Sequence, residues 1–325
     1  MTILPYILFA VGLIFIVKGG DWFIDSASWI AKVTGIPEVL IGATIVSLGT
    51  TLPELVVSST SALQGHTEMA IGNAVGSTIC NIGLILGLCN LISPSKINSR
   101  TFNIKAILMV AYTFIFLILS FDGQISRTDS AILLICLLFY IMINYLEVYN
   151  INTFSSGKKA HKNINRNNII TVTSKEVLIN MFQFLLGSFL IVSGAQLLVK
   201  YGVLIASILK IPDMIISLTA IALGTSLPEL VTSVTALIKG HRNLSVGNII
   251  GANILNISMV LGVSSFFAPL SVPAQTTYLD IPFSLLLMIT LIIPSILTWK
   301  IKRFHAFILL AEYILYLFIL ARMFL

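Results

Sequence analysis

Two glutamates stand inside apolar stretches of this chain, and each of them directly follows a proline. Glu54 lies in the stretch LGTTLPELVVSST, and Glu229 lies in the stretch LGTSLPELVTSVT. Thr50 and Thr225 precede these glutamates by four residues, so on a helix each hydroxyl shares a face with its carboxylate. Each stretch therefore presents a ladder of oxygens that could hold a cation. The next positions of the two ladders, seven residues before the glutamates, are Ser47 and Ala222.

Each proline should also free a backbone carbonyl. Proline has no N–H and crowds the carbonyl four residues earlier, so Pro53 should free that of Gly49 and Pro228 that of Gly224. Such oxygens are costly at membrane depth unless protein, water or an ion satisfies them. A simple kink, repaired by neighbouring hydroxyls, is the alternative interpretation. The adjacent glutamates favour a bound cation.

Two further stretches, GNAVGSTICNIG and GNIIGANILNIS, provide a second wall for the site. Ser77 and Asn81 are four residues apart in the first stretch and face one way, and their counterparts in the second are Ala252 and Asn256. The resulting cage is rich in oxygen and poor in nitrogen and sulfur, as Ca²⁺ prefers and as also suits Na⁺. Glycines at small-xxx-small spacing should let these helices approach others closely; they are Gly72, Gly76, Gly247 and Gly251.

These stretches belong to an internal repeat. A shift of 175 residues aligns residues 36–87 with residues 211–262 without a gap, and 24 of the 52 positions are identical. Chance would give only a handful of identities, so the sequence indicates an internal duplication.

The composition is that of an integral membrane protein. Hydrophobic residues make up 57% of the 325 residues and charged residues 10%, against about 25% charged in soluble domains. Apolar runs of roughly 18 or more residues, long enough for membrane-spanning helices, recur along the whole chain. The sequence predicts ten spans near residues 3–20, 38–63, 69–92, 102–121, 130–148, 175–199, 211–238, 244–267, 279–298 and 304–322.

The placement of charge predicts the orientation of these spans. The loops that follow the odd-numbered spans, with their flanks, hold 15 of the 19 Lys and Arg residues. The positive-inside rule places these loops in the cytoplasm and both termini outside. The net charge of +6 then reflects topology, and we expect no nucleic-acid binding. The first span lacks the features of a signal peptide, so we expect it to remain in the protein.

The two copies of the repeat occupy spans 2 and 3 and spans 7 and 8. This offset of five spans inverts the second copy relative to the first, as in many secondary transporters, whose substrate lies near the midplane between the halves. The predicted fold is all-α, with ten transmembrane helices in two inverted five-helix repeats. Residues 1–148 form the N-terminal repeat, residues 149–174 form a polar cytoplasmic linker, and residues 175–325 form the C-terminal repeat.

The two buried glutamates suggest exchange rather than simple passage of ions. Two unpaired carboxylates are costly in the membrane, so the empty protein should resist rearrangement. One Ca²⁺ cancels both charges, and several Na⁺ or two protons do likewise. A transporter is an antiporter when its binding site rearranges only after one kind of ion or the other has neutralised it. The two buried charges support this hypothesis.

At these residues the chain resembles the sodium/calcium exchanger family of the cation/calcium antiporter superfamily. The shared motifs are G-T-[ST]-L-P-E at residues 49–54 and 224–229, each followed by G-N-x-x-G-[SA]-[TN]-I-x-N-I. The resemblance covers nearly the whole chain and implies alternating access. It implies Ca²⁺ bound by Glu54, Glu229, Thr50 and Thr225, with Na⁺ at flanking sites.

The resemblance also implies the remaining lining of the site. Ser47 and Ala222 would contribute backbone carbonyls, and the site would also be lined by Ser77, Asn81, Thr51 and Ser226. The chain departs from many members of the family at Asn256, where they have aspartate, and at Ala252, where they often have serine. The site is therefore less acidic and lacks one hydroxyl.

The resemblance implies a compact prokaryotic type, because the linker has no room for the calcium-sensing domain of animal exchangers. We expect the protein in the cell (inner) membrane, with the lipid bilayer and the transported Ca²⁺ and Na⁺ as its partners. We expect no cofactor and no obligate protein partner.

Other functions remain alternatives. A Ca²⁺/H⁺ antiporter would share the fold, although the amides Asn81 and Asn256 favour sodium. A cation channel fits the inverted repeat less well, and a membrane enzyme lacks a catalytic constellation. Glu312 lies within the last span, where we expect a hydrogen-bonded structural acid, with a role in proton coupling as the alternative. His66 and His241 are expected to pack in loops rather than to bind metal.

Overall fold

The chain folds as an all-helical membrane protein. The structure, a computed structural model, describes residues 3–96, 100–159, 173–208 and 224–324. Within these ranges nine helical segments are long and apolar enough to cross a membrane, and they match nine of the ten predicted spans. The predicted seventh span, 211–238, lies partly outside the described residues; its described part contains helix α10 (Leu227–Ile238). The count of ten spans therefore stays a prediction.

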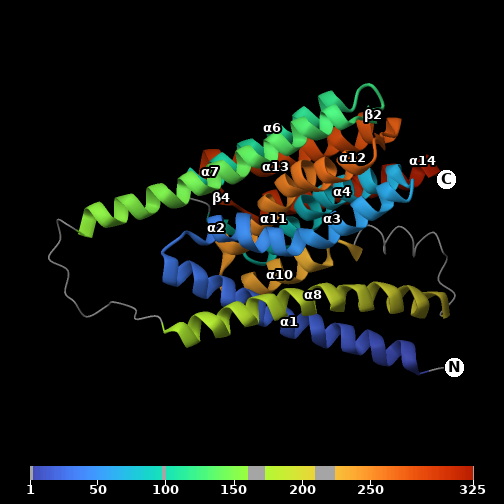
Figure 1. Ribbon diagram of the computed structural model, residues 1–325. Coiled ribbons are helices and arrows are strands. Elements are labelled where there is room, and N and C mark those ends of the chain that lie inside the picture. Colours follow the sequence, from blue (N-terminus) through green and yellow to red (C-terminus); the bar gives the residue numbers. More distant parts are fainter. Residues whose placement is uncertain (1–2, 97–99, 160–172, 209–223, 325) are drawn as a thin grey trace.

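The helices of the N-terminal half follow the predicted order (Figure 1). Their bounds are α1 (Leu4–Thr34), α2 (Glu38–Ile41), η1 (Gly42–Val46), α3 (Ser47–Leu63), α4 (Thr67–Cys80), η2 (Asn81–Leu86), α5 (Gly87–Ile92), α6 (Arg100–Leu119) and α7 (Arg127–Lys159), where η marks a π-helix.

The C-terminal half begins with α8 (Ser174–Ile208). Besides α10, its helices are α11 (Arg242–Leu255), η4 (Asn256–Val260), α12 (Leu261–Phe267), η5 (Thr276–Asp280), α13 (Ile281–Thr298) and α14 (Arg303–Phe324). The π-helices η2 and η4 begin at Asn81 and Asn256, which are equivalent positions of the sequence repeat.

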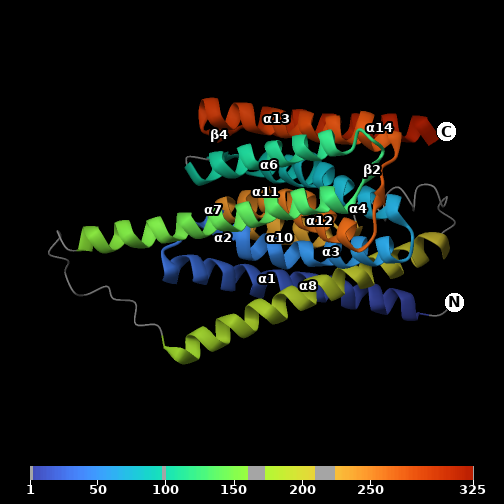
Figure 2. The ribbon, with the colours of Figure 1, turned by 45° about the horizontal axis from the view of Figure 1, so that its top comes forward.

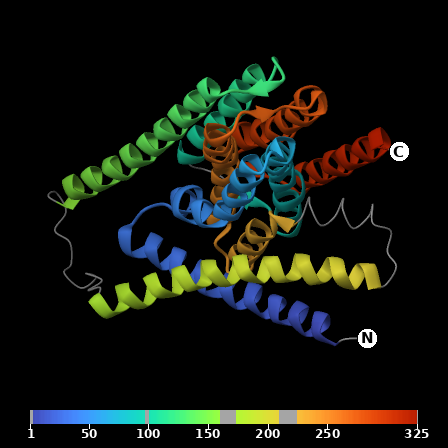
Figure 3. The ribbon, with the colours of Figure 1, turned by 45° about the vertical axis from the view of Figure 1, so that its right-hand side comes forward.

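Helices α1 and α8 form a pair along one edge of the bundle. The three views show them side by side, crossing at a shallow angle (Figures 1, 2 and 3). Their backbones touch at glycines: a Cβ at Gly19 would lie 2.8 Å from the Gly187 carbonyl oxygen, and one at Gly194 would lie 2.8 Å from the Gly12 carbonyl oxygen. These glycines therefore allow α1 and α8 to pack closely against each other.

Three of the predicted spans are shorter than the corresponding helices. Helix α1 runs to Thr34 rather than to residue 20, because its later turns pack on α8 and carry Asp21 and Asp25 beside Lys239. Helix α8 runs to Ile208, and α7 continues to Lys159, into the predicted linker. The remainder of the linker, residues 160–172, lies outside the described residues.

Two short antiparallel ladders add strands to the predicted all-α fold. Strand β1 (Ser95–Lys96) pairs with β4 (Lys300–Ile301), and β2 (Gln124–Ile125) pairs with β3 (Leu270–Ser271). Each ladder joins two loops that the distribution of charge assigns to one side of the membrane. The pairings are thus consistent with the predicted alternation of spans.

Helix α11 lies at the centre of the bundle, and its glycines allow the close approach predicted for them. A Cβ at Gly251 would lie 2.5 Å from Ser47 Oγ, and one at Gly247 would collide with the Val39 carbonyl. For Gly72 and Gly76 the close approach stays a prediction, because the positions equivalent to Val39 and Ala43, residues 214 and 218, lie outside the described residues.

The two prolines act differently on their helices. Pro53 lies inside the continuous helix α3, and the irregular backbone is the π-helix η1 that ends just before Ser47. Pro228 stands in the first turn of α10, directly after the turn at Thr225 and Ser226. Of the two prolines, Pro53 thus lies within a continuous helix, whereas Pro228 lies where a helix begins.

Candidate ion-binding site

Glu54 and Glu229 face each other in the interior of the protein. Both side chains are 0% exposed, one on α3 and the other in the first turn of α10. Their carboxyl groups are close enough to interact, and the Glu229 carboxyl also lies beside the hydroxyls of Thr50 and Thr51. Among the described residues, however, none of the four carboxylate oxygens meets hydrogen-bond geometry with a partner. Two acidic groups so placed call for a cation between them.

Hydroxyls surround the carboxylates. Thr50 donates to the Ser47 carbonyl at 3.2 Å or to Asn248 Oδ1 at 3.3 Å. Ser77 Oγ on α4 lies 3.3 Å from Thr225 Oγ1 in the turn before α10. A hydroxyl of the first repeat thus contacts a hydroxyl of the second. The buried hydroxyls of Thr51 and Ser226 have no partner within the described ranges.

Two predicted amides are buried in π-helices that pack against the helices of the two glutamates. Asn81 Nδ2 donates to Asn253 Oδ1 at 3.0 Å, which leaves Asn81 Oδ1 without a partner in the described part of the chain. Neither amide atom of Asn256 has a partner there. Both residues are 0% exposed and begin the π-helices η2 and η4, and η4 packs against α3 and α4. A π-helix within an α-helix frequently marks a functional site.

The structure describes all but one of the predicted site residues. Ser47 is buried directly after η1 and donates its hydroxyl to the Thr44 carbonyl at 3.1 Å. Ala222 lies outside the described residues. The structure brings Glu54, Glu229, Thr50 and Thr51 together and places Ser77 beside Thr225, next to Ser226 in the chain. Helices α3, α4 and α10, which carry these residues, also contact η2 or η4, which begin at Asn81 and Asn256.

Three further asparagines, Asn73, Asn248 and Asn253, form hydrogen bonds with residues of the candidate site or near it. They were not among the residues predicted from the sequence. Asn73 donates to Ser58 Oγ at 2.9 Å and to the Glu54 carbonyl at 3.4 Å. Asn248 donates to Thr232 Oγ1 at 3.0 Å while it accepts from Thr50. Asn253 accepts from Asn81. The repeated Gly-Asn dipeptide was the available signal for the first two, whereas Asn253 has a threonine in the other repeat.

A cavity of about 650 Å³ reaches this region from the face of α8. Its lining includes Pro53, Asn73, Thr225 and Pro228, together with Lys200 of α8. Because this cavity touches Thr225, it connects the candidate site to the α8 side of the bundle.

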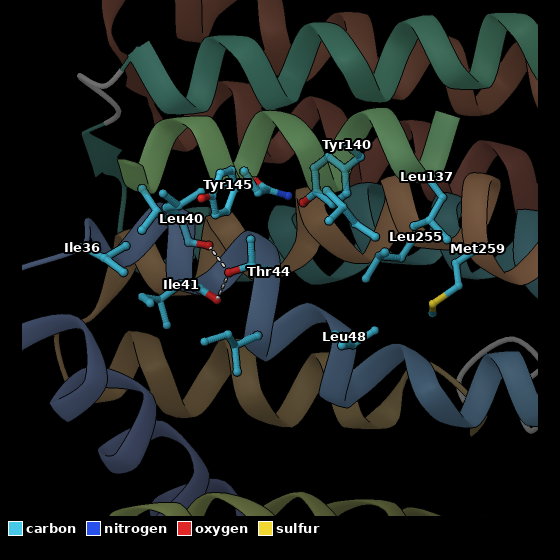
Figure 4. Close-up of a pocket in the computed structure, with 14 residues that line it drawn as sticks. Ile36, Leu40, Ile41, Thr44, Leu48, Leu137, Tyr140, Tyr145, Leu255 and Met259 are labelled. Atoms are coloured by element: carbon cyan, nitrogen blue, oxygen red, sulfur yellow. Dashed lines mark hydrogen bonds between the residues drawn. The ribbon is translucent and has the colours of Figure 1, made fainter. Parts of the chain in front are cut away.

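A second pocket of about 450 Å³ is not suited to cations. Leu40, Leu137 and Met259 give it an apolar lining between α2, α7 and η4 (Figure 4). The Thr44 hydroxyl in its wall already donates to the Leu40 carbonyl at 2.6 Å. The lining of this pocket therefore offers few oxygen atoms that could replace the hydration shell of a cation.

The other membrane-embedded acids have their own partners. Glu312 Oε1 accepts from Thr290 Oγ1 at 2.9 Å, as expected for a hydrogen-bonded structural acid, and its Oε2 has no hydrogen-bond partner among the described residues. Asp280 accepts from the Tyr316 hydroxyl at 3.1 Å. His241 was expected to pack in a loop, and its Nδ1 lies 2.8 Å from Glu38 Oε1 across the α1 to α2 turn.

Comparison with known proteins gives an extensive match. The model of the sodium/calcium exchanger protein family matches residues 4–146 and 179–322. The chain is 33% identical to the sodium/calcium exchanger MaX1 of Methanosarcina acetivorans over 98% of this chain and 99% of that protein. It is also 33% identical to the inner membrane protein YrbG of Escherichia coli over 90% of this chain and 88% of that protein.

A solved structure has the same fold. The sodium-calcium exchanger NCX_Mj, soaked with 10 mM Na⁺ and zero Ca²⁺, superposes with a TM-score of 0.82 at 30% sequence identity. The match covers 97% of this chain and 98% of that chain. The similarity thus extends over both halves of the repeat.

Proposed function

Because the chain belongs to the sodium/calcium exchanger protein family, we propose that the ions it exchanges bind at Glu54 and Glu229. The protein is a secondary active antiporter of Na⁺ and Ca²⁺ in the membrane and not an enzyme. The transported ions are its substrates, and a Ca²⁺/H⁺ antiporter is not favoured. The residues that bind these ions are our proposal.

One observation carries the assignment. The two carboxylates are fully buried opposite each other, and none of their oxygens is satisfied by the described residues. Ca²⁺ takes 6 to 8 oxygen ligands and carries the charge that both acids need. The ligand set we propose consists of Glu54, Glu229, Thr50, Thr225, Ser47, Thr51, Ser226, Ser77, Asn81, Asn256 and, outside the described residues, Ala222.

Both repeats contribute to this site. The contact between Ser77 and Thr225 and the facing pair Glu54 and Glu229 each join one repeat to the other. A site shared between two inverted halves can be exposed first to one side and then to the other when the halves rearrange. We therefore propose residues 1–148 and 175–325 as the two halves, with residues 149–174 as a cytoplasmic linker.

We also propose the orientation in the cell membrane, with both termini outside. The support is the excess of Lys and Arg in loops assigned to the cytoplasm and the pairing of loops that share a side. The cavity beside Lys200 would then provide access from the outer side.

The function is tested by Ca²⁺ uptake into proteoliposomes that contain the purified protein. An outward Na⁺ gradient should drive uptake, and a pH gradient of the same size without Na⁺ should not. Uptake driven by the pH gradient alone would contradict sodium coupling. Protein-free vesicles treated with the same gradients are the control for leakage.

A further inference from the structure

A cluster of ion pairs joins α1 to the turn between α10 and α11, on the side that the proposed orientation places in the cytoplasm. Lys239 Nζ lies 2.8 Å from Asp25 Oδ1 and 3.1 Å from Asp21 Oδ1, and it also donates to the Asp21 carbonyl at 3.1 Å. The two carboxylates stand four residues apart on α1, so one ammonium group bridges both. These three residues are called the Lys239 clasp below.

The clasp lies beside a tightly packed contact between α1 and α10. A Cβ at Gly20 would lie 3.0 Å from Thr235 Oγ1 of α10. Phe23 and Ile24 of α1 are 0% exposed and share an apolar cluster with Ala236 of α10. Since α1 belongs to the first repeat and α10 to the second, an opening between them on this side would have to separate these surfaces and break the clasp.

A second contact on the same side is not specific to it. His241 Nδ1 lies 2.8 Å from Glu38 Oε1. The shift of 175 residues aligns this pair with His66 and Asp213, of which Asp213 lies outside the described residues. The sequence therefore offers a histidine and an acid to both sides, and this pair gives no reason to favour one of them.

The Lys239 clasp, in contrast, has no equivalent in the other half of the chain. The same shift aligns its members with residues that include no acid: Lys239 with Gln64, Asp21 with Gln196 and Asp25 with Lys200. The shift applies to α1 and α8 as well, because it also aligns the glycines at which these two helices touch. One lysine and two glutamines cannot form an ion pair with one another.

An interaction that exists on one side only changes the balance between two conformations. A bond made equally in both conformations shifts nothing, whereas a bond made in one of them favours that conformation. The side chains of Lys239, Asp21 and Asp25 are 23%, 40% and 60% exposed. Water and salt screen such pairs, and the two together should shift the equilibrium roughly 2- to 30-fold.

We propose that the Lys239 clasp holds the cytoplasmic side closed and thereby favours the conformation in which the ion-binding site faces the outside. This inference rests on the proposed function and orientation. Breaking the clasp should make the cytoplasmic side open more often, while no ligand of the proposed site is changed.

A cysteine on the buried side of α1 reports this opening. Ser26 is 0% exposed and its hydroxyl has no partner among the described residues, so Ser26→Cys is a nearly isosteric reporter. A membrane-impermeant maleimide is added to inside-out vesicles, in which the cytoplasmic face is accessible. Adding Lys239→Gln should raise the labelling rate of Ser26→Cys roughly 2- to 30-fold. Lys239→Arg keeps the positive charge and should leave the rate close to that of Ser26→Cys alone.

Two matched controls separate the clasp from general effects of charge and folding. Arg242→Gln removes an exposed cation three residues from Lys239 that forms no ion pair with the described residues, and it should not change the rate. Ser295→Cys places a buried cysteine near the cytoplasmic end of α13, away from α1, and it should stay unlabelled when Lys239→Gln is added.

The labelling rates decide the inference. An unchanged rate of Ser26→Cys in Lys239→Gln would overturn it, and so would equal increases at Ser26→Cys and Ser295→Cys, which would show a general loosening. Labelling of Ser26→Cys only from the outside of intact cells would overturn the assignment of the clasp to the cytoplasmic side. The labelling is read without transport, whereas absence of Na⁺-driven Ca²⁺ uptake by the unchanged protein would contradict the proposed function, so the two failures are distinguishable.

Discussion

The hydroxyl of Tyr140 on α7 donates a hydrogen bond to the backbone carbonyl of Ala43, inside the π-helix η1. Tyr140 is buried, and the Lys105 ammonium lies 5.3 Å from the centre of its ring. Because η1 leads directly into α3 at Ser47, this bond connects α7 to the π-helix that precedes Thr50 and Glu54.

Tyr140→Phe should destabilise the protein by about 1–3 kcal/mol, because it leaves the buried Ala43 carbonyl without its donor. Thermal unfolding in detergent measures the loss as a lower Tm. Tyr145→Phe is the matched control, because Tyr145 lines the same pocket but is 67% exposed. Equal Tm values for the two variants would show that the bond contributes nothing.

The buried ion pair between Lys105 and Glu147 should show strong coupling. Their side chains are 1% and 16% exposed. Removing one partner by Lys105→Met or Glu147→Leu leaves the other charge unpaired and should cost about 3–5 kcal/mol. The double variant Lys105→Met/Glu147→Leu should recover much of this loss. A double-mutant cycle of Tm values measures the coupling, and purely additive losses would contradict it.

The close approach of α11 to α2 should make Gly247 intolerant of a side chain. Gly247→Ala places a Cβ against the Val39 backbone, and the overpacking should cost about 1–3 kcal/mol or prevent folding. Gly202→Ala, whose Cβ would lie 3.4 Å from the Phe9 ring, makes only an ordinary van der Waals contact among the described residues and should be tolerated. Yield and Tm in detergent compare the two; a stable Gly247→Ala protein would contradict the packing.

Labelling of single cysteines tests the orientation. Asp122→Cys, in the loop that carries β2, should react with a membrane-impermeant maleimide added to intact cells. Lys302→Cys, in the loop that carries β4, should react only after the cells are opened. The native cysteines Cys80, Cys89 and Cys136 are buried, which keeps the background low. The reverse pattern would place both termini in the cytoplasm.

The sequence predicted the spans well and singled out the two acids that the structure buries opposite each other, because both features give strong local signals. Apolar runs mark spanning helices, and acids within them are rare enough to stand out. Glu54, Glu229 and the threonines near them could therefore be proposed as a site from spacing alone. The duplication further indicated that two such stretches would meet.

Features set by tertiary packing could not be read in this way. The π-helices at Asn81 and Asn256 insert one residue into an otherwise regular pattern, and no composition signal marks them. The length of α1 depends on its contact with α8, which a hydropathy pattern does not contain. The partners of Asn73, Asn248 and Asn253 depend on side-chain geometry between helices.

The central claim is that Glu54 and Glu229 together bind Ca²⁺, and equilibrium ⁴⁵Ca²⁺ binding to the purified protein tests it most directly. Glu312→Gln is the matched control, because Glu312 is also embedded in the membrane but is bonded to Thr290. Glu54→Gln and Glu229→Gln should each weaken Ca²⁺ binding at least roughly 100-fold, since removing one charge from a buried set costs about 3 kcal/mol or more. Glu312→Gln should bind as the unchanged protein does. Unchanged Ca²⁺ binding in Glu54→Gln, in Glu229→Gln and in the double variant would contradict the claim.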